Sequence, residues 1–408
     1  MPYEVRKQYN HFLRIGVTLF LYALTSLFYV ANAASQTVGS IDALRSALDN
    51  ASAGDTILLE DGDYGLFDIH NYNFSDYVTL SSVNAKNAIF ASINVERSSF
   101  IKLDSLTFIP GAREGVGIFD DSHHVQVLNS KFYGVNQFNR DTPSYDQVTT
   151  LYGINVDDAN DLLIQDNEAT DFKSSAYLFT SMANSIVKGN SCDWVASDCY
   201  KLSGVDSLLF ENNFGAQNVY SSPDAHVDFV QGQGDVSNSV FRGNVAIMGS
   251  KSFQGLFFDD ATFTNLTFEN NLIYTGHIRG ISVNGDNSTG IVARYNTILR
   301  TANTQKATLI FLPDNSIKEL NIEANNVAKN NDRFGDNIIT QWDDLTDIAH
   351  YSLYYTNATH GPYATIADFT PIKGSLADGQ FGAFKRINEL LNGNSKPYLS
   401  PVLMLLID

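Results

Sequence analysis

Short runs of alternating apolar and polar residues recur along this chain, and many of them end in asparagine. The pattern apolar-x-apolar-x-x-Asn is found between residues 162 and 325, at intervals of 23 to 31 residues. The copies end at Asn167, Asn190, Asn213, Asn244, Asn271, Asn296 and Asn325, and weaker copies upstream end at Val83, Leu106 and Ser130. Self-similarity at such a period indicates a repeat architecture in which each repeat supplies a short strand.

Each repeat is too short to bury its own apolar face, whereas repeats stacked in parallel form continuous strand ladders around one elongated core. The terminal asparagine is expected to take the left-handed α conformation in a turn and to stack on the asparagine of the next repeat. A leucine-rich repeat is disfavoured because its leucine spacing and a helical periodicity between the strands are missing. The pattern therefore predicts an all-β, right-handed parallel β-helix.

A second alternating segment in each repeat supplies a second strand. We align these segments so that one residue of each points into the core, namely Ile154, Tyr177, Tyr200, Val227, Leu256 and Ile281. Period-two alternation then turns the next residues outward, namely Asn155, Leu178, Lys201, Asp228, Phe257 and Ser282. Because neighbouring strands lie about 4.8 Å apart, this alignment predicts that Lys201 and Asp228 are direct neighbours.

The two ends of a solenoid expose unpaired strand edges, so a cap is expected at each. Ile41, Leu44 and Leu48 have helical spacing and predict an N-terminal helical cap, and an amphipathic run over 384–391 is the candidate for the closing cap. The expected segments are a signal peptide at 1–33 and one β-helix domain at 34–408, with its cap and first strand at about 38–64, rungs at 65–330, and closing rungs and cap at 331–408.

The N-terminus has the pattern of a secretory signal peptide. Arg6, Lys7 and Arg14 precede an apolar stretch over 15–30, and a small-residue triplet follows that ends at Ala33. The stretch is short for a membrane anchor, so cleavage after Ala33 is expected. No later run is long and apolar enough to cross a membrane. We therefore expect a secreted or periplasmic protein with no membrane contact after cleavage.

Charge narrows the range of partners. The formal net charge is −19, and the mature chain has a charge of about −21, because the signal peptide contains three basic residues and one acidic residue. Such acidity argues against nucleic acid as a partner. It also repels an anionic polysaccharide, so a site for one requires local Lys, Arg or His side chains or a bound cation. Nothing in the sequence singles out an oligomeric interface.

The chain has two cysteines, Cys192 and Cys199, with six residues between them. In an oxidising compartment one interpretation is a local disulfide, and the other is two buried thiols. A single pair is too few for a disulfide-dense scaffold.

The stretch from Val38 to Tyr64, which contains GDTILLEDGDY, resembles the N-terminal part of secreted β-helix uronan lyases. Together with the repeats and with DFTPIKGSLADGQFGA near the end, the likeness covers nearly all of the mature chain. It is nearest to the alginate lyase and chondroitinase B group within the pectin-lyase-like superfamily. This resemblance implies a right-handed parallel β-helix that acts on an anionic polysaccharide. The Asn-Gly-Gly-Glu segment of that group is absent, so candidate site residues are taken from this chain's own pattern.

The polar chemistry is richest over 198–279, where CYKLSG, SPDAHVDFVQGQ, FQGLFFDD and HIRG follow on successive rungs. Lys201 is the first candidate for a catalytic base, because a lysine packed near other cations can give up its proton in the working pH range. His226 is a candidate acid or base, and Asp228 is a candidate to orient it, to pair with Lys201 or to hold a cation. Gln231 is a candidate to bind a sugar hydroxyl. The alternative is a solvated salt bridge between Lys201 and Asp228 beside a hydrogen-bonded histidine.

Arg279 lies three rungs beyond the candidate base, roughly 14 Å along the axis. Its planar fork suits a uronate carboxylate in a flanking subsite, where His277 adds a contact. Tyr220 is a candidate for stacking on a sugar ring or for donating a proton, and Phe257 is a candidate for stacking. Gln254 is a further candidate for substrate binding.

Acidic side chains near this region raise the question of a metal. Asp259 and Asp260 form an acidic pair with Asp228 in the same region, and Ca²⁺ requires six to eight oxygen ligands. Aspartates that form turns are the favoured interpretation, with Ca²⁺ as the alternative. No other cofactor is indicated.

These observations predict a polysaccharide lyase that cleaves an anionic uronan by β-elimination, with alginate as the expected substrate. A mannuronan C5-epimerase shares the proton abstraction and differs in returning the proton. A glycoside hydrolase instead needs paired carboxylates, for which Asp228, Asp259 and Asp260 are available. A non-catalytic solenoid that binds glycans or serves in adhesion is the alternative from a different class.

Overall fold

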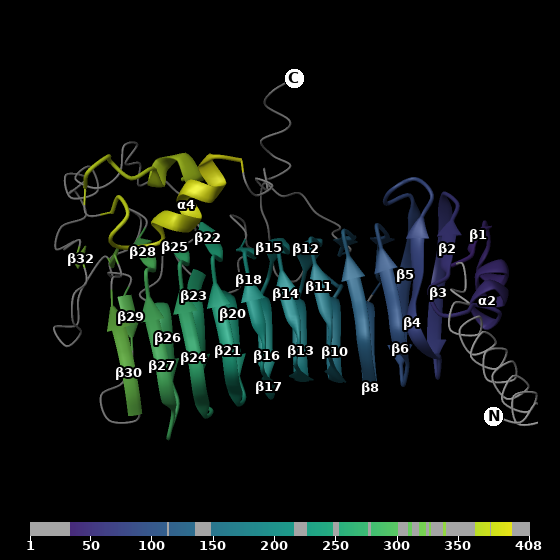
Figure 1. Ribbon diagram of the computed structural model, residues 1–408, viewed down its shortest axis with the longest axis horizontal. Helices are drawn as coiled ribbons and strands as arrows, with labels where there is room; N and C mark the ends of the chain where they lie inside the picture. Colours follow the sequence, from purple (N-terminus) through teal and green to yellow (C-terminus); the bar gives the residue numbers. More distant parts are fainter. Residues whose placement is uncertain are drawn as a thin grey trace, which may run out of the picture.

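The computed structural model describes residues 33–111, 114–134, 148–215, 227–247, 253–275, 279–299, 364–375 and 377–393, and the backbone alone of 300, 309–311, 318–323, 326–327 and 338–339. Residues 1–32 of the predicted signal peptide lie outside the described residues. Figure 1 shows the strands stacked side by side along one axis, from the N-terminal turns in purple to the later turns in green. The predicted parallel β-helix is confirmed.

The strands form three ladders in which the pairings between turns are parallel. The first ladder contains β3 (Gly62–His70), β5 (Ala88–Glu96), β8 (Glu114–Leu128), β10 (Tyr152–Asn160), β13 (Ser175–Ala183), β16 (Asp198–Ser203), β20 (Val227–Gln233), β23 (Phe253–Asp259), β26 (Arg279–Asn284) and β29 (Leu309–Phe311). The second ladder contains β1 (Ser35–Val38), β2 (Thr56–Leu59), β4 (Asn73–Ser82), β6 (Ser99–Asp104), the end of β8, β11 (Leu163–Gln165), β14 (Ile186–Lys188), β17 (Val205–Asp206), β18 (Leu209–Glu211), β21 (Val236–Arg242), β24 (Phe263–Glu269), β27 (Thr289–Arg294) and β30 (Lys318–Glu323). The third ladder contains β7 (Thr107–Phe108), β9 (Lys131–Tyr133), β12 (Glu168–Phe172), β15 (Ser191–Val195), β19 (Phe214–Gly215), β22 (Val245–Ile247), β25 (Leu272–Thr275), β28 (Thr297–Arg300), β31 (Asn326–Val327) and β32 (Ile338–Ile339).

The core is a continuous column of side chains from successive turns. One hydrophobic cluster extends from Val38 to Ile298. Aromatic rings at equivalent positions stack on each other, with ring centroids 4.7 Å apart both for Phe108 and Phe132 and for Tyr177 and Tyr200. The alternation in the sequence thus becomes a stack of like residues, because every second side chain of a strand points to the same face.

A ladder of buried asparagines ties the turns together at the corner between the second and third ladders. The side-chain oxygen of Asn213 accepts a hydrogen bond from the backbone N–H of Asn190 at 3.0 Å, and its amide donates to the carbonyl of Val187 at 2.9 Å. The same arrangement recurs at Asn167, Asn190, Asn244, Asn271 and Asn296. The predicted stacking of these asparagines is confirmed.

The prediction that these asparagines take the left-handed conformation is wrong, because the residue before each asparagine takes it instead. Positive φ angles occur at the residue before each of them, namely Asp166, Gly189, Asn212, Gly243, Asn270 and Tyr295. The preceding residue makes the turn, which leaves the side chain of the ladder asparagine pointing inward to bond the backbone of the neighbouring turns. This position needs hydrogen-bonding capacity rather than backbone freedom.

The N-terminal cap is confirmed as helix α2 (Ile41–Asp49). The side chain of Ser40 accepts a hydrogen bond from the N–H of Ala43 at 3.2 Å, which satisfies one of the free donors at the helix start. Leu44, Ala47 and Leu48 are buried in the main hydrophobic cluster. Figure 1 shows α2 at the N-terminal end, next to β1 and β2.

Near the C-terminus, the 3₁₀ helix η2 (Ile366–Phe369) and helix α4 (Phe384–Leu391) form as a small helical unit. The run that was predicted to close the solenoid packs against its side (Figure 1), since Ile387 and Leu390 share a separate hydrophobic cluster with Leu272 and Tyr274 of β25. Among the described helices, none is both long and apolar enough to span a membrane.

Replacement of Asn213 by alanine is expected to lower the free energy of unfolding by about 1–3 kcal/mol, because it leaves the buried N–H of Asn190 and the carbonyl of Val187 without partners. Denaturant unfolding measures this change. Asn160→Ala is the control, since Ala183 occupies the equivalent position of the next turn. Equal midpoints for both variants would contradict the role of the ladder.

Candidate functional site

The first ladder brings the predicted polar residues together in a register that differs from the predicted one at β20. Tyr200 pairs with Val230, not with Val227, and Lys201 therefore pairs with Gln231, not with Asp228. Val227 likewise pairs with Phe253 of β23 and not with Leu256, so the predicted alignment is wrong on both sides of β20. The predicted pairs that do not involve β20 are confirmed, namely Ile154 with Tyr177, Tyr177 with Tyr200, and Leu256 with Ile281. Both valines of VDFVQ are apolar, and the alternation alone could not decide which one faces Tyr200.

The corrected register aligns two columns of positions along the first ladder. The outer column, on β16, β20, β23 and β26, contains Lys201, Gln231, Phe257 and Ser282. The inner column lies three residues earlier on the same strands and contains Asp198, Asp228, Gln254 and Arg279. Asp228 thus stacks on Asp198, and Ser175 of β13 precedes Asp198 in the same column.

The inner column is enclosed. Asp198 is 2% exposed, and Asp228 and Gln254 are 0% exposed. The backbone N–H of Asp228 donates to a carboxyl oxygen of Asp198 at 3.1 Å. Within the described part of the chain, the side-chain oxygens of Asp228 and both polar side-chain atoms of Gln254 have no hydrogen-bond partner. Buried polar groups are normally satisfied, so this column is an exception of the kind found at functional sites.

Burial and mutual repulsion act on the two carboxyl groups. Burial raises the pKa of Asp198 to about 7, against the opposing effects of the hydrogen bond from Asp228 and of the charge of Lys201. Burial also raises the pKa of Asp228 well above its usual value, and the nearby charge of Asp198 adds to this, while Arg279 and Lys201 oppose it. Because two adjacent buried carboxylates cannot both ionise cheaply, the pair retains a proton at neutral pH.

Lys201 and Arg279 are closer than their three-strand separation suggests. The guanidinium of Arg279 lies over the ring of Phe257, with 4.3 Å from Cζ to the ring centroid. Phe257 belongs to β23, so the guanidinium of Arg279 lies over the strand that precedes its own on the side of β16. The distance along the axis from this guanidinium to β16, which carries Lys201, is therefore two strand spacings, roughly 10 Å. Phe257 is only 5% exposed, which differs from the open sugar platform that was predicted.

The remaining predicted site residues fall into two groups. Gln231 is half-buried between Lys201 and Phe257 in the outer column. Tyr220, His226 and His277 lie outside the described residues, so their predicted roles stay predictions. The alternative salt bridge between Lys201 and Asp228 is not found among the ion pairs of the described residues, because the register places Gln231 at that position.

Asp259 and Asp260 lie at the end of β23, away from Asp228. Asp259 pairs with Gln233 and Asn284 along the ladder, and its carboxylate accepts a hydrogen bond from the backbone N–H of Asp260 at 3.1 Å. The positive φ of Asp260 is that of a turn. Within the residues that the structure describes, no three His, Cys, Asp or Glu side chains group as metal ligands. Bound Ca²⁺ stays a prediction.

Cys192 of β15 and Cys199 of β16 are joined in a disulfide, with 5.7 Å between their Cα atoms. Both are buried. The bond ties the start of β16, which carries Asp198 and Lys201, to the preceding strand.

The sequence analysis missed Asp198 as a site residue. Asp198 could have been found from its position relative to the core residue. It lies two residues before Tyr200, and Asp228 lies two residues before Val230, which pairs with Tyr200. The wrong alignment of β20 concealed this equivalence.

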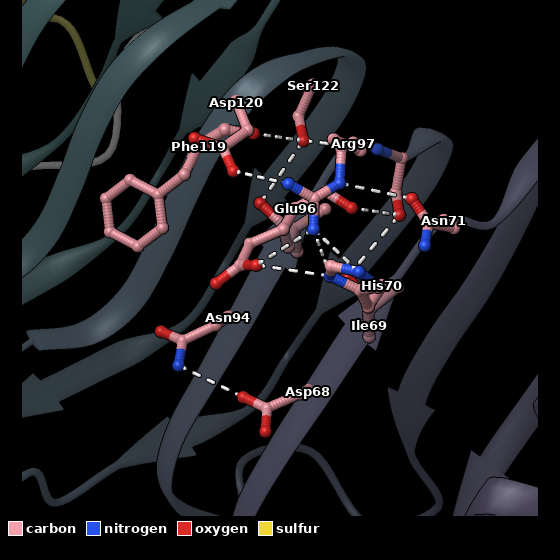
Figure 2. A network of polar contacts seen from close by, with 12 residues as sticks. Asp68, Ile69, His70, Asn71, Asn94, Glu96, Arg97, Phe119, Asp120 and Ser122 are labelled. Carbon is pink, nitrogen blue, oxygen red and sulfur yellow. Dashed lines mark hydrogen bonds and ion pairs between the residues drawn. The ribbon is translucent and has the colours of Figure 1, made fainter.

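A second polar cluster lies on the N-terminal turns and has a different character. Figure 2 shows His70, Glu96, Arg97 and Asp120 in contact at one corner of β3, β5 and β8. Arg97 and Asp120 form an ion pair at 2.8 Å, and His70 contacts Glu96 at 3.1 Å. Arg97 and Asp120 have about half of their side chains exposed, so these pairs are solvated and carry little energy.

Asp228→Asn is expected to raise the thermal midpoint by a few degrees at pH 8 and to have little effect near pH 4. Burial raises the folded-state pKa of Asp198 to about 7 and that of Asp228 well above the unfolded value. Each group therefore contributes stability that is complete below about 3.8 and is lost as pH rises through its own folded-state pKa.

Asp206→Asn is the control of opposite sign for these thermal denaturation curves. Hydrogen bonds from Ser237, Ser207 and Asn238 lower the pKa of Asp206, so its contribution is present at pH 8 and is lost in acid. A lower midpoint for Asp228→Asn at pH 8 would contradict the strain of the buried pair.

Comparisons with known proteins support the fold. No curated protein matches the chain. Among solved structures, an alginate lyase from Paenibacillus sp. str. FPU-7 is 14% identical over 71% of this chain and 99% of that chain, with a TM-score of 0.42. The PL6 family alginate lyase AlyGC is 14% identical over 76% of this chain and 50% of that chain, with a TM-score of 0.50. The catalytic domain of a GH87 alpha-1,3-glucanase in complex with nigerose is 12% identical over 74% of this chain and 60% of that chain, with a TM-score of 0.39.

Likeness at these identities bears on the fold alone. The family model described as the right handed beta helix region matches residues 93–298, which is half of the chain. This match agrees with the parallel ladders from β5 to β28 and confirms the predicted handedness. The chain therefore belongs to the right-handed β-helix family.

Proposed function

We propose that this protein is a polysaccharide lyase that cleaves an anionic uronan by β-elimination. The observation that carries the proposal is the convergence of Lys201 and Arg279 on a buried carboxyl pair at one face of the first ladder. The chain has a net charge of −19, but here the positive charges of Lys201 and Arg279 both act on the carboxyl group of Asp228.

β-Elimination makes three demands on a site. A positive or hydrogen-bonding group must neutralise the uronate carboxylate, a base must take the proton on the adjacent carbon, and a proton must reach the leaving glycosidic oxygen. Arg279 fits the first role, because its fork binds carboxylates in two hydrogen bonds. Lys201 fits the second role, since it is only half-buried and its amine can therefore reach a substrate.

Neutral polar groups next to the cations suit the sugar hydroxyls. Gln231 is half-buried, so its amide is the one of these groups that reaches the surface, whereas Gln254 and Ser282 on the next two strands are fully buried with side-chain atoms that have no partner among the described residues. AlyGC shares the fold and is an alginate lyase, so alginate is the first substrate to test.

A glycoside hydrolase is the second candidate, and the Asp198 and Asp228 pair is the observation that favours it. Two carboxyl groups with separated protonation states are the usual machinery of such enzymes. Here they contact each other instead of flanking an open space, and an uncharged glucan would make no use of Arg279. The site therefore favours an anionic substrate.

The setting of this activity is also a proposal. The predicted signal peptide would deliver the protein to the periplasm or the medium, where extracellular polysaccharides occur. The acidic surface favours a substrate that approaches through the cationic part of the first ladder.

Incubation of the mature protein with alginate, pectate, chondroitin or hyaluronan is expected to raise the ultraviolet absorbance of unsaturated uronic-acid ends on one of them. Lys201→Ala should lower the rate by about 100-fold or more, because it removes the base. Arg279→Ala should lower it comparably through the lost carboxylate contact. Initial rates of the absorbance change measure both effects.

Lys188→Ala is the matched control, since Lys188 is also half-buried and lies on β14 of the second ladder. It should retain the rate of the unchanged protein. New reducing ends without unsaturated products would instead establish hydrolysis, and inverted C5 configuration without shortening would establish epimerisation. No change in any of the four polymers would contradict a lyase for these substrates.

A further inference from the structure

We infer that the ring of Phe119 is a platform on which a sugar ring of a polysaccharide chain stacks, in a distal subsite on the same ladder as Lys201. The inference rests on the proposed function for its ligand, and it extends the site toward the N-terminal turns. The distal subsite consists of Phe119 and Gly117 of β8, Asn94 of β5 and Asn155 of β10.

Phe119 is an apolar exception among polar positions. It pairs with Glu96 of β5 and with Asp157 of β10, and Thr180 and Ser203 follow at the same position of the next two strands. Its side chain is half-buried, and within the described part of the chain it belongs neither to a hydrophobic cluster nor to the residues packed against one. The ring therefore lies on the outer face of the ladder and does not serve the core.

Gly117 explains how the ring is placed. A Cβ atom added at Gly117 would overlap the ring of Phe119 and would lie 2.7 Å from the side-chain oxygen of Asn94. Figure 2 shows the ring directed away from Arg97, with Asn94 on the neighbouring strand. Glycine weakens the interior of a strand and often marks a place where a ligand approaches closely. The glycine and the phenylalanine are thus two exceptions at one point of the ladder.

Two amide side chains lie on either side of this point. Asn94 and Asn155 pair with Gly117 from the two neighbouring strands, and both are half-buried. The amide nitrogen of Asn94 donates a hydrogen bond to Asp68 at 3.1 Å. A pyranose has an apolar C–H face and a rim of hydroxyl groups, so it fits an aromatic face that has amides beside it.

The charges around the ring argue against recognition of a carboxylate here. Glu96 is contacted by His70 at 3.1 Å and by Arg97 at 3.8 Å, and Arg97 also pairs with Asp120. Asp157 is exposed to solvent on the other side of the ring. A uronate ring would therefore turn its carboxylate away from these acids and bind through its apolar face and its hydroxyl groups.

The distal subsite lies in line with the candidate base. Gly117 and Lys201 occupy the same position of the first ladder, with Asn155 and Leu178 between them. This separation is three strand spacings, roughly 14 Å along the axis. A sugar residue of an extended chain is about as long as one strand spacing, so a chain that reaches both places spans about three residues between them. The expected ligand is therefore a polymer or a long oligosaccharide.

The test measures binding and does not require catalysis. Each variant is made in the Lys201→Ala background, so that a lyase leaves the polymer intact. The proteins are run through native gels that contain alginate, pectate, chondroitin or hyaluronan. The polymer that retards Lys201→Ala is then used at increasing concentrations, which gives an apparent Kd for each variant.

Phe119→Ala is expected to raise this Kd about fivefold or more, because the stacking surface is lost. Gly117→Ala should raise it as well, since the new Cβ displaces the ring, whereas Phe119→Tyr keeps the ring and should bind as before. Tyr133→Ala is the matched control, because Tyr133 is an exposed aromatic residue of β9 in the third ladder, and its loss should leave the Kd unchanged. Thermal denaturation confirms that each variant is folded.

A series of oligosaccharides of increasing length gives a second readout. The effect of Phe119→Ala on the Kd should grow with chain length, because only a long chain reaches from Lys201 to the ring. An effect of equal size on short and long chains would overturn the distal position of the subsite.

An unchanged Kd in Phe119→Ala, or retardation by none of the four polymers, would overturn the inference. An equal loss of affinity in Tyr133→Ala would also overturn it, since binding would then not depend on this face. A protein that binds through Phe119 but forms no unsaturated ends would refute the lyase alone. The two proposals therefore fail in different experiments.

Discussion

Parallel backbone hydrogen bonds between successive turns are the constraint on which the rest of this structure depends. They hold equivalent positions of neighbouring strands about 4.8 Å apart, so each side chain meets its counterpart from the next turn. Where that counterpart is aromatic or an amide, the contact is favourable, as for Phe108 on Phe132 and for Asn190 on Asn213. The same rule stabilises the core and aligns the polar columns.

Stacking of equivalent side chains is unfavourable where both residues are acids. Asp228 stacks on Asp198, and both side chains are buried. Burial and the charge of Asp198 raise the pKa of Asp228, which favours its protonated form. A turn that carried serine or glutamine at this position, as its neighbours do, would avoid the penalty. The pair is therefore an exception of the kind that occurs at functional sites, where stability is given up.

Cations are scarce on this chain, and the first ladder gathers two of them on one face. Lys201 and Arg279 belong to strands three turns apart, but the contact of Arg279 with Phe257 draws its charge back along the axis. The resulting site extends over β16, β20, β23 and β26, so a polymer that lies along the solenoid would meet several turns at once. An extended surface of this kind is what a stacked repeat offers and a compact domain does not.

The sequence by itself determined the repeat, the parallel stacking, the N-terminal helix and the asparagine ladder, because each depends on local alternation or on a residue type that recurs at every turn. It also determined the face on which Lys201 lies, since the alignment of β13 and β16 was right. Only the tertiary structure decided the register of β20. The segment VDFVQ offers Val227, Phe229 and Val230 to the core, and a shift of three residues exchanges the two faces of a strand. Packing selected Val230, opposite Tyr200, and this choice placed Asp228 on Asp198. Contacts between distant turns, such as Arg279 on Phe257 and α4 on β25, were likewise beyond a local pattern, because they depend on the three-dimensional positions of residues far apart in the chain.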